Sequence, residues 1–232
     1  MREAPDDGQY EAEYFRRARH LHDPNSSFHR YRIANILGLH TPGPTDSVLD
    51  MGTGWGTIAF VVAPLAREVV GIDLSDHSVS FCRDRLAHAD PAPNNVRFMQ
   101  GDVRDCGLPS ESFDVVYAAD LFEHLWPEES NLTVAEACRV LRPGGMLVVW
   151  MPCRSHAIEV LRNRNIILRR EPGHVDYKSM PRTKAMLTNA GFDIVSARYA
   201  ESHLPLLRTV ERLGKRWIPL LRRRIGIVGR KP

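Results

Sequence analysis

The residues Val48–Gly56, VLDMGTGWG, place a carboxylate and three alternate glycines at the end of an apolar run. A glycine-rich loop between a buried strand and a helix lets the backbone approach a ligand closely. A dinucleotide loop requires the spacing G-x-G-x-x-G. Here the spacing is G-x-G-x-G, and Thr57 stands where the third glycine would fall. Asp50 also precedes the first glycine, where a carboxylate suits a cationic group better than a pyrophosphate. The loop therefore predicts a ligand site that is not built for a dinucleotide.

Short β-rich runs alternate with helical stretches on either side of this loop. The expected strands are residues 47–52, 68–73, 96–102, 113–120, 146–151, 192–199 and 224–232. The expected helices are residues 55–66, 74–89 with Ser75 as N-cap, 128–141 ended by RPGG, and 179–191 closed by Gly191. Such alternation predicts an α/β fold in which a mostly parallel sheet is covered by helices on both faces.

The first 45 residues are expected to form a helical cap before a main domain over residues 46–232. Residues 1–9 are acidic and poor in apolar side chains, which predicts disorder. Residues 10–39 read as two helices broken at HDPNSS. Aromatic and histidine side chains are concentrated between Tyr10 and Tyr31. These residues either cover a ligand site at the sheet or simply pack against the sheet.

Two more carboxylates end expected strands. Asp73 ends the second strand, 21 residues after Gly52, where it could accept hydrogen bonds from ribose hydroxyls. Asp102 ends the third strand, where it could accept a hydrogen bond from an amino group. A ligand with a ribose, an amine and no phosphate fits these positions better than NAD does.

Four successive motifs carry a family resemblance: VLDMGTGWG, VVGIDLS, MQGDVRDCGLPSESFDVVYAADLFEHLWP and EACRVLRPGGMLVVW. In this order and spacing, residues 47–151 resemble class I S-adenosylmethionine-dependent methyltransferases, in the branch similar to quinone-biosynthesis enzymes. The stretch EPGHVDYKSMPRTKAMLTNAGFDIV extends the resemblance. Thr53 and Trp55 depart from the usual loop residues of this branch. The resemblance implies a Rossmann-like sheet of seven strands, mostly parallel, with one antiparallel strand near the C-terminus.

The resemblance also implies S-adenosylmethionine as cofactor and S-adenosylhomocysteine as product. The implied contacts are Asp50 with the ammonium group; Gly52, Thr53, Gly54 and Gly56 with the methionine end and ribose; Asp73 with the ribose hydroxyls; Leu74 with the adenine face; Asp102 and Val103 with the adenine amino group; and Ala119 beneath the sulfonium.

A hydroxyl acceptor would gain from a general base, and the catalytic candidates follow the fourth strand. They are Asp120, Glu123 and His124, with His174 as a further candidate after the fifth strand. The alternative is structural: Glu123 and His124 would brace a helix start, and His174 would occupy a turn. No motif predicts a metal site, because GDVRD lacks the paired His, Asp and Asn set of a magnesium-dependent catechol enzyme.

The charge is divided between the two parts of the chain. Residues 1–141 contain 12 Lys and Arg against 22 Asp and Glu, or −10, whereas residues 142–232 contain 19 against 6, or +13. Residues 203–224 are basic, with Leu206, Leu207, Val210, Leu213 and Trp217 near helical spacing. This pattern is typical of an amphipathic helix that contacts a membrane surface or an anionic ligand. The alternative is a helix that packs on the domain with a solvated basic face. The segment could also meet nucleic-acid phosphates, but the chain shows no separate RNA-binding motif.

These observations favour an enzyme that methylates a small-molecule or lipid-like acceptor, at a hydroxyl oxygen rather than at carbon or nitrogen. The alternatives are a tRNA or protein methyltransferase of the same fold, or a non-catalytic protein that binds the cofactor. The chain has no run of about 18 apolar residues and no apolar signal segment, so we expect a cytoplasmic protein that at most contacts a membrane peripherally. The sequence leaves the oligomeric state open.

Overall fold

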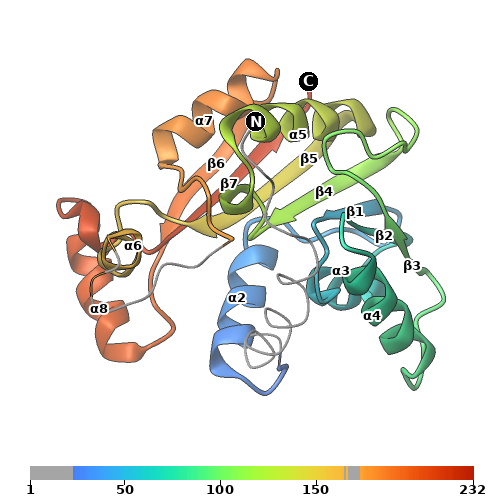
Figure 1. The fold of residues 1–232 in the computed structure, drawn as a ribbon, viewed down its shortest axis with the longest axis horizontal. Coiled ribbons are helices and arrows are strands. Elements are labelled where there is room, and N and C mark those ends of the chain that lie inside the picture. The colour runs from blue at the N-terminus through green and yellow to red at the C-terminus, as the bar shows by residue number, and fades with distance from the viewer. Residues whose placement is uncertain (1–22, 165, 167–172) are drawn as a thin grey trace.

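A computed structural model describes residues 23–164, 166 and 173–232. Its centre is a sheet of seven strands in the order β3-β2-β1-β4-β5-β7-β6 (Figure 1). The strands are β1 (Ser47–Met51), β2 (Glu68–Asp73), β3 (Val96–Gln100), β4 (Phe113–Ala119), β5 (Leu141–Pro152), β6 (Asp193–Ala200) and β7 (Arg224–Arg230).

Strand directions confirm the predicted topology. β1 pairs in parallel with β2 and β4, and the parallel pairing continues to β3 on one side and β5 on the other. β7 is antiparallel to both of its neighbours, β5 and β6. The predicted sheet of seven mostly parallel strands, with one antiparallel strand near the C-terminus, is therefore confirmed.

β5 is longer than the sequence predicted. The RPGG stretch ends the preceding helix as expected, but β5 already begins at Leu141 rather than at Met146. Leu141 pairs with Phe113, and the register then shifts before Val115 pairs with Met146. Gly144 has a φ of 83°. The two glycines therefore lie within an irregular part of the strand and not in a separate turn.

Seven helices of four or more residues are found in the described part of the chain. They are α2 (Ser27–Leu37), α3 (Thr57–Val62), α4 (Asp76–Ala87), α5 (Pro127–Val140), α6 (Ala157–Asn163), α7 (Met180–Asn189) and α8 (Pro205–Gly214). Ser26 and Ser75 cap α2 and α4 through their hydroxyl oxygens, the second as predicted. α6 was not predicted. The helix expected at the start of residues 10–39 and the disorder expected for residues 1–9 lie outside the described residues.

The helices cover the two faces of the sheet (Figure 1). α5 and α7 bury Val134 and Leu187 in one core, and α2, α3 and α4 bury Ile36, Ile58 and Val79 in the other. The loops that follow β1, β2, β3 and β4 leave the carboxyl ends of parallel strands, so they lie along one edge of the sheet. Open α/β sheets bind their ligands at this edge.

The four cysteines are free thiols, and Cys82, Cys106 and Cys153 are buried. Burial raises the pKa of Cys82 and raises that of Cys106 to about 11, so both are protonated at neutral pH. They behave as small apolar side chains of the core. No helix among the described residues is both long and apolar enough to span a bilayer.

Candidate cofactor and acceptor site

The glycine loop after β1 takes left-handed backbone conformations at three positions. Gly52, Gly54 and Gly56 have φ values of 69°, 51° and 69°. A Cβ on Gly52 would lie 2.8 Å from Leu121 Cδ1, and one on Gly56 would lie 2.9 Å from Phe60 Cε2. A Cβ on Gly54 would instead enter open space, with its nearest neighbour 4.0 Å away. Gly52 and Gly56 thus pack against neighbouring side chains, while the side of Gly54 that a Cβ would occupy is open.

Asp50 lies beneath this loop and holds it in place. Its Oδ2 accepts hydrogen bonds from Thr53 Oγ1 at 2.7 Å and from the Ala59 amide of α3 at 3.2 Å. Burial raises the pKa of Asp50 to about 6, and the Thr53 hydrogen bond opposes that rise. The structure thus gives both residues an internal bracing role. The contacts of Asp50 and Thr53 with the cofactor remain predictions.

Asp73 ends β2 and contacts the glycine loop, and Leu74 follows it. The Asp73 carboxylate accepts the Gly54 amide at 2.8 Å and the Ser75 amide at 3.0 Å. These bonds hold the carboxylate at the end of β2, and its contact with ribose hydroxyls stays a prediction. The Leu74 side chain is large, apolar and 60% exposed, as a residue that packs against an adenine face would be.

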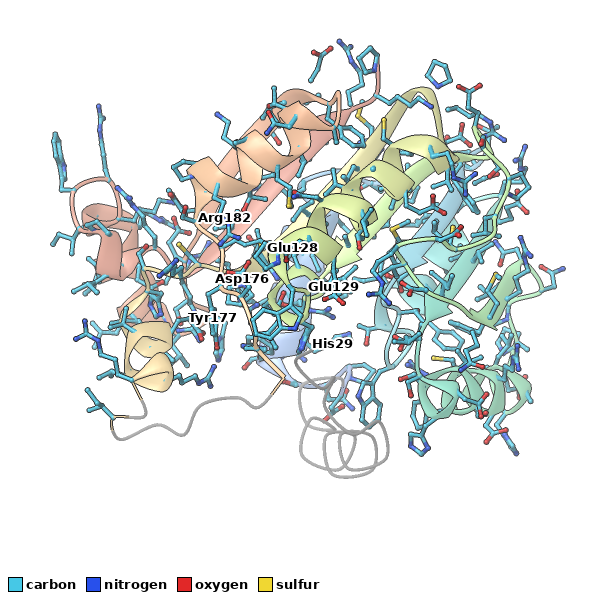
Figure 2. The ribbon with its side chains drawn as sticks, turned by 45° about the horizontal axis from the view of Figure 1, so that its top comes forward. His29, Glu128, Glu129, Asp176, Tyr177 and Arg182 are labelled. Atoms are coloured by element: carbon cyan, nitrogen blue, oxygen red, sulfur yellow. The ribbon has the colours of Figure 1, made fainter. Side chains whose placement is uncertain are left out.

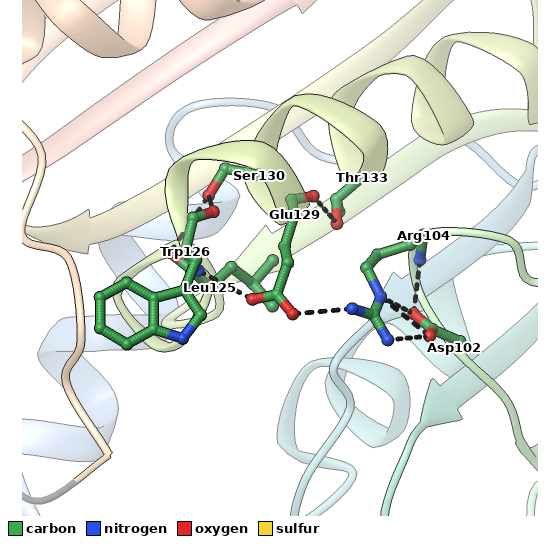
Figure 3. A network of polar contacts seen from close by, with 7 residues as sticks. All are labelled: Asp102, Arg104, Leu125, Trp126, Glu129, Ser130 and Thr133. Carbon is green, nitrogen blue, oxygen red and sulfur yellow. Dashed lines mark hydrogen bonds and ion pairs between the residues drawn. The ribbon is translucent and has the colours of Figure 1, made fainter. Parts of the chain in front are cut away.

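Asp102 belongs to a polar network that links the end of β3 to the start of α5 (Figure 3). Arg104 pairs with Asp102 through Nη2 at 2.5 Å and with Glu129 through Nη1 at 2.7 Å. The Arg104 hydrogen bond is the main reason that the pKa of Asp102 is lowered. Asp102 is therefore ionised, and its hydrogen bond to the adenine amino group stays a prediction. Val103 and Ala119, the remaining predicted cofactor contacts, are buried at this edge of the sheet.

Asp120 has both carboxylate oxygens paired with guanidinium groups. Oδ2 lies 2.6 Å from Arg32 Nε on α2, and Oδ1 lies 2.5 Å from Arg224 Nη1 on β7. Burial alone would raise the pKa of Asp120, but Arg224 and Arg32 lower it to about 2. A carboxylate this acidic is a poor proton acceptor. The structure therefore makes Asp120 an anchor between α2 and β7, and its place among the general-base candidates stays a prediction.

Glu123, His124 and His174 come together from two separate parts of the chain. The rings of His124 and His174 are 4.8 Å apart between centroids, in an edge-to-face arrangement. His124 Nδ1 lies 2.9 Å from the Gly173 carbonyl, so Nδ1 is the protonated nitrogen and Nε2 carries the lone pair. Burial lowers the pKa of His124, and burial followed by the His124 charge lowers that of His174 to about 3. Both imidazoles are thus neutral at pH 7.

Glu123 is buried, and its Oε2 makes no hydrogen bond within the described part of the chain. Burial, and then the charge of Asp120, raise the pKa of Glu123 to about 8. The side chain is therefore largely protonated at neutral pH and unsuited to accept a proton. Its backbone carbonyl accepts the Val175 amide at 2.9 Å, which fastens the segment that carries His174.

Tyr177 and Lys178, which the sequence did not single out, hold the histidines in place. His174 Nδ1 lies 2.6 Å from the Tyr177 hydroxyl, and Lys178 Nζ donates to the Phe122 carbonyl at 2.5 Å. Figure 2 shows the segment with Asp176 and Tyr177 running past the start of α5, where Glu128 and Glu129 lie. A cavity of about 340 Å³ opens on Tyr177 and is also lined by Arg154, Val160, Arg164, Val175 and Asp176. No local motif marks Lys178, because its partner Phe122 lies 56 residues away. Tyr177 lies only three residues after its partner His174.

Among the described residues, Glu123, His124 and His174 could also offer ligand atoms to a metal, since these atoms lie within 4.8 Å of one another. The protonation state of Glu123 does not suit that use. Burial, followed by the Asp120 charge, raises the pKa of Glu123 to about 8, so its carboxyl group is mainly protonated at neutral pH. The absence of a metal from this cluster stays a prediction.

Comparisons with known proteins agree with the geometry. A family model described as a methyltransferase domain matches residues 48–145. A probable S-adenosylmethionine-dependent methyltransferase of Mycolicibacterium smegmatis is 31% identical over 75% of this chain and 62% of its own length. The ubiquinone/menaquinone biosynthesis C-methyltransferase UbiE of Ectopseudomonas mendocina is 33% identical over 77% of this chain and 66% of its own length. The chain belongs to the class I S-adenosylmethionine-dependent methyltransferases.

The fold of this family member also matches solved structures. The [4+2]-cyclase SpnF superimposes with a TM-score of 0.70 at 19% identity, over 99% of this chain and 97% of SpnF. The chain spans less than two thirds of the length of the first relatives that it matches, with values of 62% and 54%. S-adenosylmethionine is the cofactor of the family. The open space at Gly54, the ionised Asp102 and the exposed Leu74 beside Asp73 fit this molecule.

Proposed function

We propose that this chain transfers a methyl group from S-adenosylmethionine to a hydroxyl oxygen of a small-molecule or lipid-like acceptor. The observation that carries the proposal is the pair of neutral histidines, His124 and His174, at the carboxyl edge of the sheet beside the expected cofactor site. When bound, S-adenosylmethionine supplies a methyl group activated by its sulfonium. The residues of the chain then have to orient the acceptor, exclude water and accept a proton.

His124 is the proposed base. Its Nδ1–H donates to the Gly173 carbonyl, which fixes the ring and leaves the basic lone pair on Nε2. His174 packs edge-on against this ring and is itself held by the Tyr177 hydroxyl. A positioned general base accelerates such a reaction by about 10²–10⁴-fold. His174 is proposed to contact the acceptor, because the cavity of about 340 Å³ opens on its partner Tyr177.

The cofactor side of the proposal rests on positions that the fold brings to one edge. Gly54 and Asp73 would contact the methionine end and the ribose, and Leu74 and Asp102 the adenine. Asp50 and Thr53 would act mainly through the shape of the loop, since both are bound to each other inside it.

A second candidate function is cofactor binding without methyl transfer. SpnF, a cyclase by name, has this fold, so the fold alone does not require a methyl acceptor. Methylation of tRNA or protein is a further alternative on the same scaffold. The half-buried histidine pair favours a small acceptor, because a macromolecule offers its reactive group from a surface.

The experiment uses S-adenosylmethionine labelled on its methyl group, incubated with the protein and a cell extract from its source organism. The products are separated into organic-soluble, aqueous small-molecule, RNA and protein fractions. We expect label in one of the two small-molecule fractions and loss of that label with the His124→Ala variant. Label in RNA or protein would overturn the proposed acceptor class. Tight cofactor binding without label in any fraction would favour the non-catalytic alternative.

A further inference from the structure

α8 is oriented with its apolar side toward solvent. Leu206, Val210 and Leu213 recur at helical spacing and are 83%, 48% and 76% exposed. Glu211, on the same helix, is completely buried. A surface helix of a globular protein normally places its apolar stripe toward the core and its charged residues toward water. α8 does the opposite, because its apolar stripe faces solvent together with the exposed basic residues Arg208 and Arg212.

Polar contacts fix this orientation. The Glu211 carboxylate accepts the Ser202 amide and lies 3.3 Å from His156 Nε2, at the start of α6. Lys215 Nζ, just after the helix, donates to the Tyr199 carbonyl at 2.8 Å and pairs with Glu201. A helix held to the domain through its buried acid cannot turn its apolar stripe inward without breaking these contacts. The exposed stripe is therefore a stable feature of the fold.

The exposed apolar surface continues beyond the helix. We define the C-terminal apolar patch by the residues Leu204, Leu206, Val210, Leu213, Trp217, Ile218 and Leu220, each at least 48% exposed. Trp217 is 77% exposed, although tryptophan is among the most costly side chains to leave in water. Figure 1 shows α8 beside α6, beyond the end of the sheet, so the patch forms an outer surface of the molecule.

The charges around the patch have one sign. Residues 202–222 contain five basic residues, Arg208, Arg212, Lys215, Arg216 and Arg222. Glu211 is the one acidic residue in this range, and it is buried. Arg208, Arg212 and Arg216 are exposed and follow one another at intervals of four residues, beside the apolar stripe. Exposed Leu and Trp side chains flanked by a row of arginines are typical of helices that lie in the interface of an anionic bilayer.

We propose that the C-terminal apolar patch docks this chain onto the surface of an anionic lipid bilayer. Leu206, Leu213 and Trp217 enter the boundary between headgroups and acyl chains, and the arginine row meets the lipid phosphates. A nucleic acid would use the arginines but would leave the leucine stripe in water.

Docking of this kind also orients the candidate site. His156 joins α8 to the start of α6, and Val160 of α6 lines the cavity that opens on Tyr177. The cavity is thus connected to the bilayer surface through one short helix. That the bilayer supplies a lipid-like acceptor rests on the proposed function, whereas the docking itself does not.

Vesicle binding tests the docking without any methyl transfer. The protein is sedimented with vesicles of phosphatidylcholine alone and of phosphatidylcholine mixed with phosphatidylglycerol. We expect binding to the mixed vesicles, at least about tenfold weaker in Leu213→Ser/Trp217→Ser because two membrane-inserted side chains are lost. The Arg212→Gln/Arg216→Gln variant should bind the mixed vesicles about tenfold more weakly than the parent. At high salt, vesicle binding by this variant and by the parent should be equal.

The matched control is Leu132→Ser, which removes a leucine that is 55% exposed on α5, away from the patch. It should bind vesicles like the parent. Circular dichroism and cofactor affinity confirm that each variant is folded. Absence of binding to mixed vesicles, or equal binding by Leu213→Ser/Trp217→Ser and the parent, would overturn the proposal. The proposal would also be overturned if the protein bound RNA through the patch and did not bind vesicles. Because no turnover is measured, an inactive protein that binds vesicles would contradict only the proposed function.

Discussion

Among the three glycines of the loop, Gly54 is the one whose position is not explained by packing against neighbouring side chains. Its φ of 51° and the open space on its Cβ side suit a ligand, whereas Gly52 and Gly56 are crowded by Leu121 and Phe60. Gly54→Ala should weaken S-adenosylmethionine binding by about tenfold or more, because the new methyl group occupies that space. Calorimetric titration with the cofactor measures the effect.

Gly107→Ala is the matched control, since Gly107 has a φ of 66° and nothing within 4 Å of the position that an added methyl group would occupy. Both variants place alanine in a left-handed conformation, at a cost of about 1–2 kcal/mol. The unfolding temperature should therefore fall in both variants, and cofactor affinity only in Gly54→Ala. Equal cofactor affinity in the two variants would remove Gly54 from the site.

The histidine pair gives a pH prediction. The base acts in its neutral form, so activity is present above the folded-state pKa and is lost as the pH falls through it. The pKa of His124 is lowered and that of His174 is about 3. We expect kcat/KM to stay level as the pH falls through 6.5 and to decline only at more acidic values. His124→Ala should reduce kcat by about 10²–10⁴-fold with unchanged cofactor affinity. His88→Ala, at an exposed position on the end of α4, should behave like the parent.

Sequence spacing was sufficient to predict which residues meet when each of them lies at the end of a strand or directly after it. Asp73 ends β2, and the glycines end β1, so their meeting at one edge follows from parallel pairing. The partners of Asp120 could not be predicted in this way. Arg32 lies 88 residues before it and Arg224 lies 104 residues after it, and both also fit an ordinary surface role in a basic chain. Only the packed fold shows that the Asp120 carboxylate is paired with these two arginines.

At the scale of elements, the local sequence pattern predicted the helices that are long and the strands that alternate with helices. The βα alternation and the Ser75 cap placed the central strands and α4 within a few residues of their observed bounds. α6 escaped prediction because it has seven residues and follows β5 without a clear apolar period. The helical spacing of α8 was recognised, but its orientation was not, because the buried partner of Glu211 lies on α6. Periodicity locates a face of a helix but does not say which neighbour covers it.

The ion pairs of Asp120 test how α2 and β7 are joined. Asp120→Asn leaves the Arg32 and Arg224 guanidinium groups without their counter-charge. Since Asp120 is a quarter exposed, we expect a loss of roughly 2–4 kcal/mol in unfolding free energy, slightly below that of a fully buried pair. Denaturant titration measures it. Asp193→Asn removes a surface partner of Arg230 at 3.5 Å and should cost about 0–1 kcal/mol. If both variants lose the same amount, the Asp120 pairs do not anchor α2.

At the scale of the whole molecule, the candidate acceptor site is built from residues of widely separated segments. Arg32 comes from α2, Glu123 and His124 from the loop after β4, His174 and Lys178 from the segment before α7, and Arg224 from β7. The topology brings these segments to the same edge, because β4 and β5 are central parallel strands and β7 returns beside β5. The sequence predicted the edge correctly, but the charge balance at that edge depends on all of these segments together.

That balance yields a prediction about metals. Glu123, His124 and His174 offer ligand atoms within 4.8 Å of one another, an arrangement that could hold a divalent cation. Burial, followed by the Asp120 charge, raises the pKa of Glu123 to about 8, and a mainly protonated carboxyl group is a poor ligand for a cation. Dialysis against EDTA should therefore leave methyl transfer and the unfolding temperature unchanged. Added magnesium, manganese or zinc should not stimulate the dialysed protein. Activity lost on dialysis and restored by one of these ions would instead assign the cluster to a metal, and His124 to its ligands.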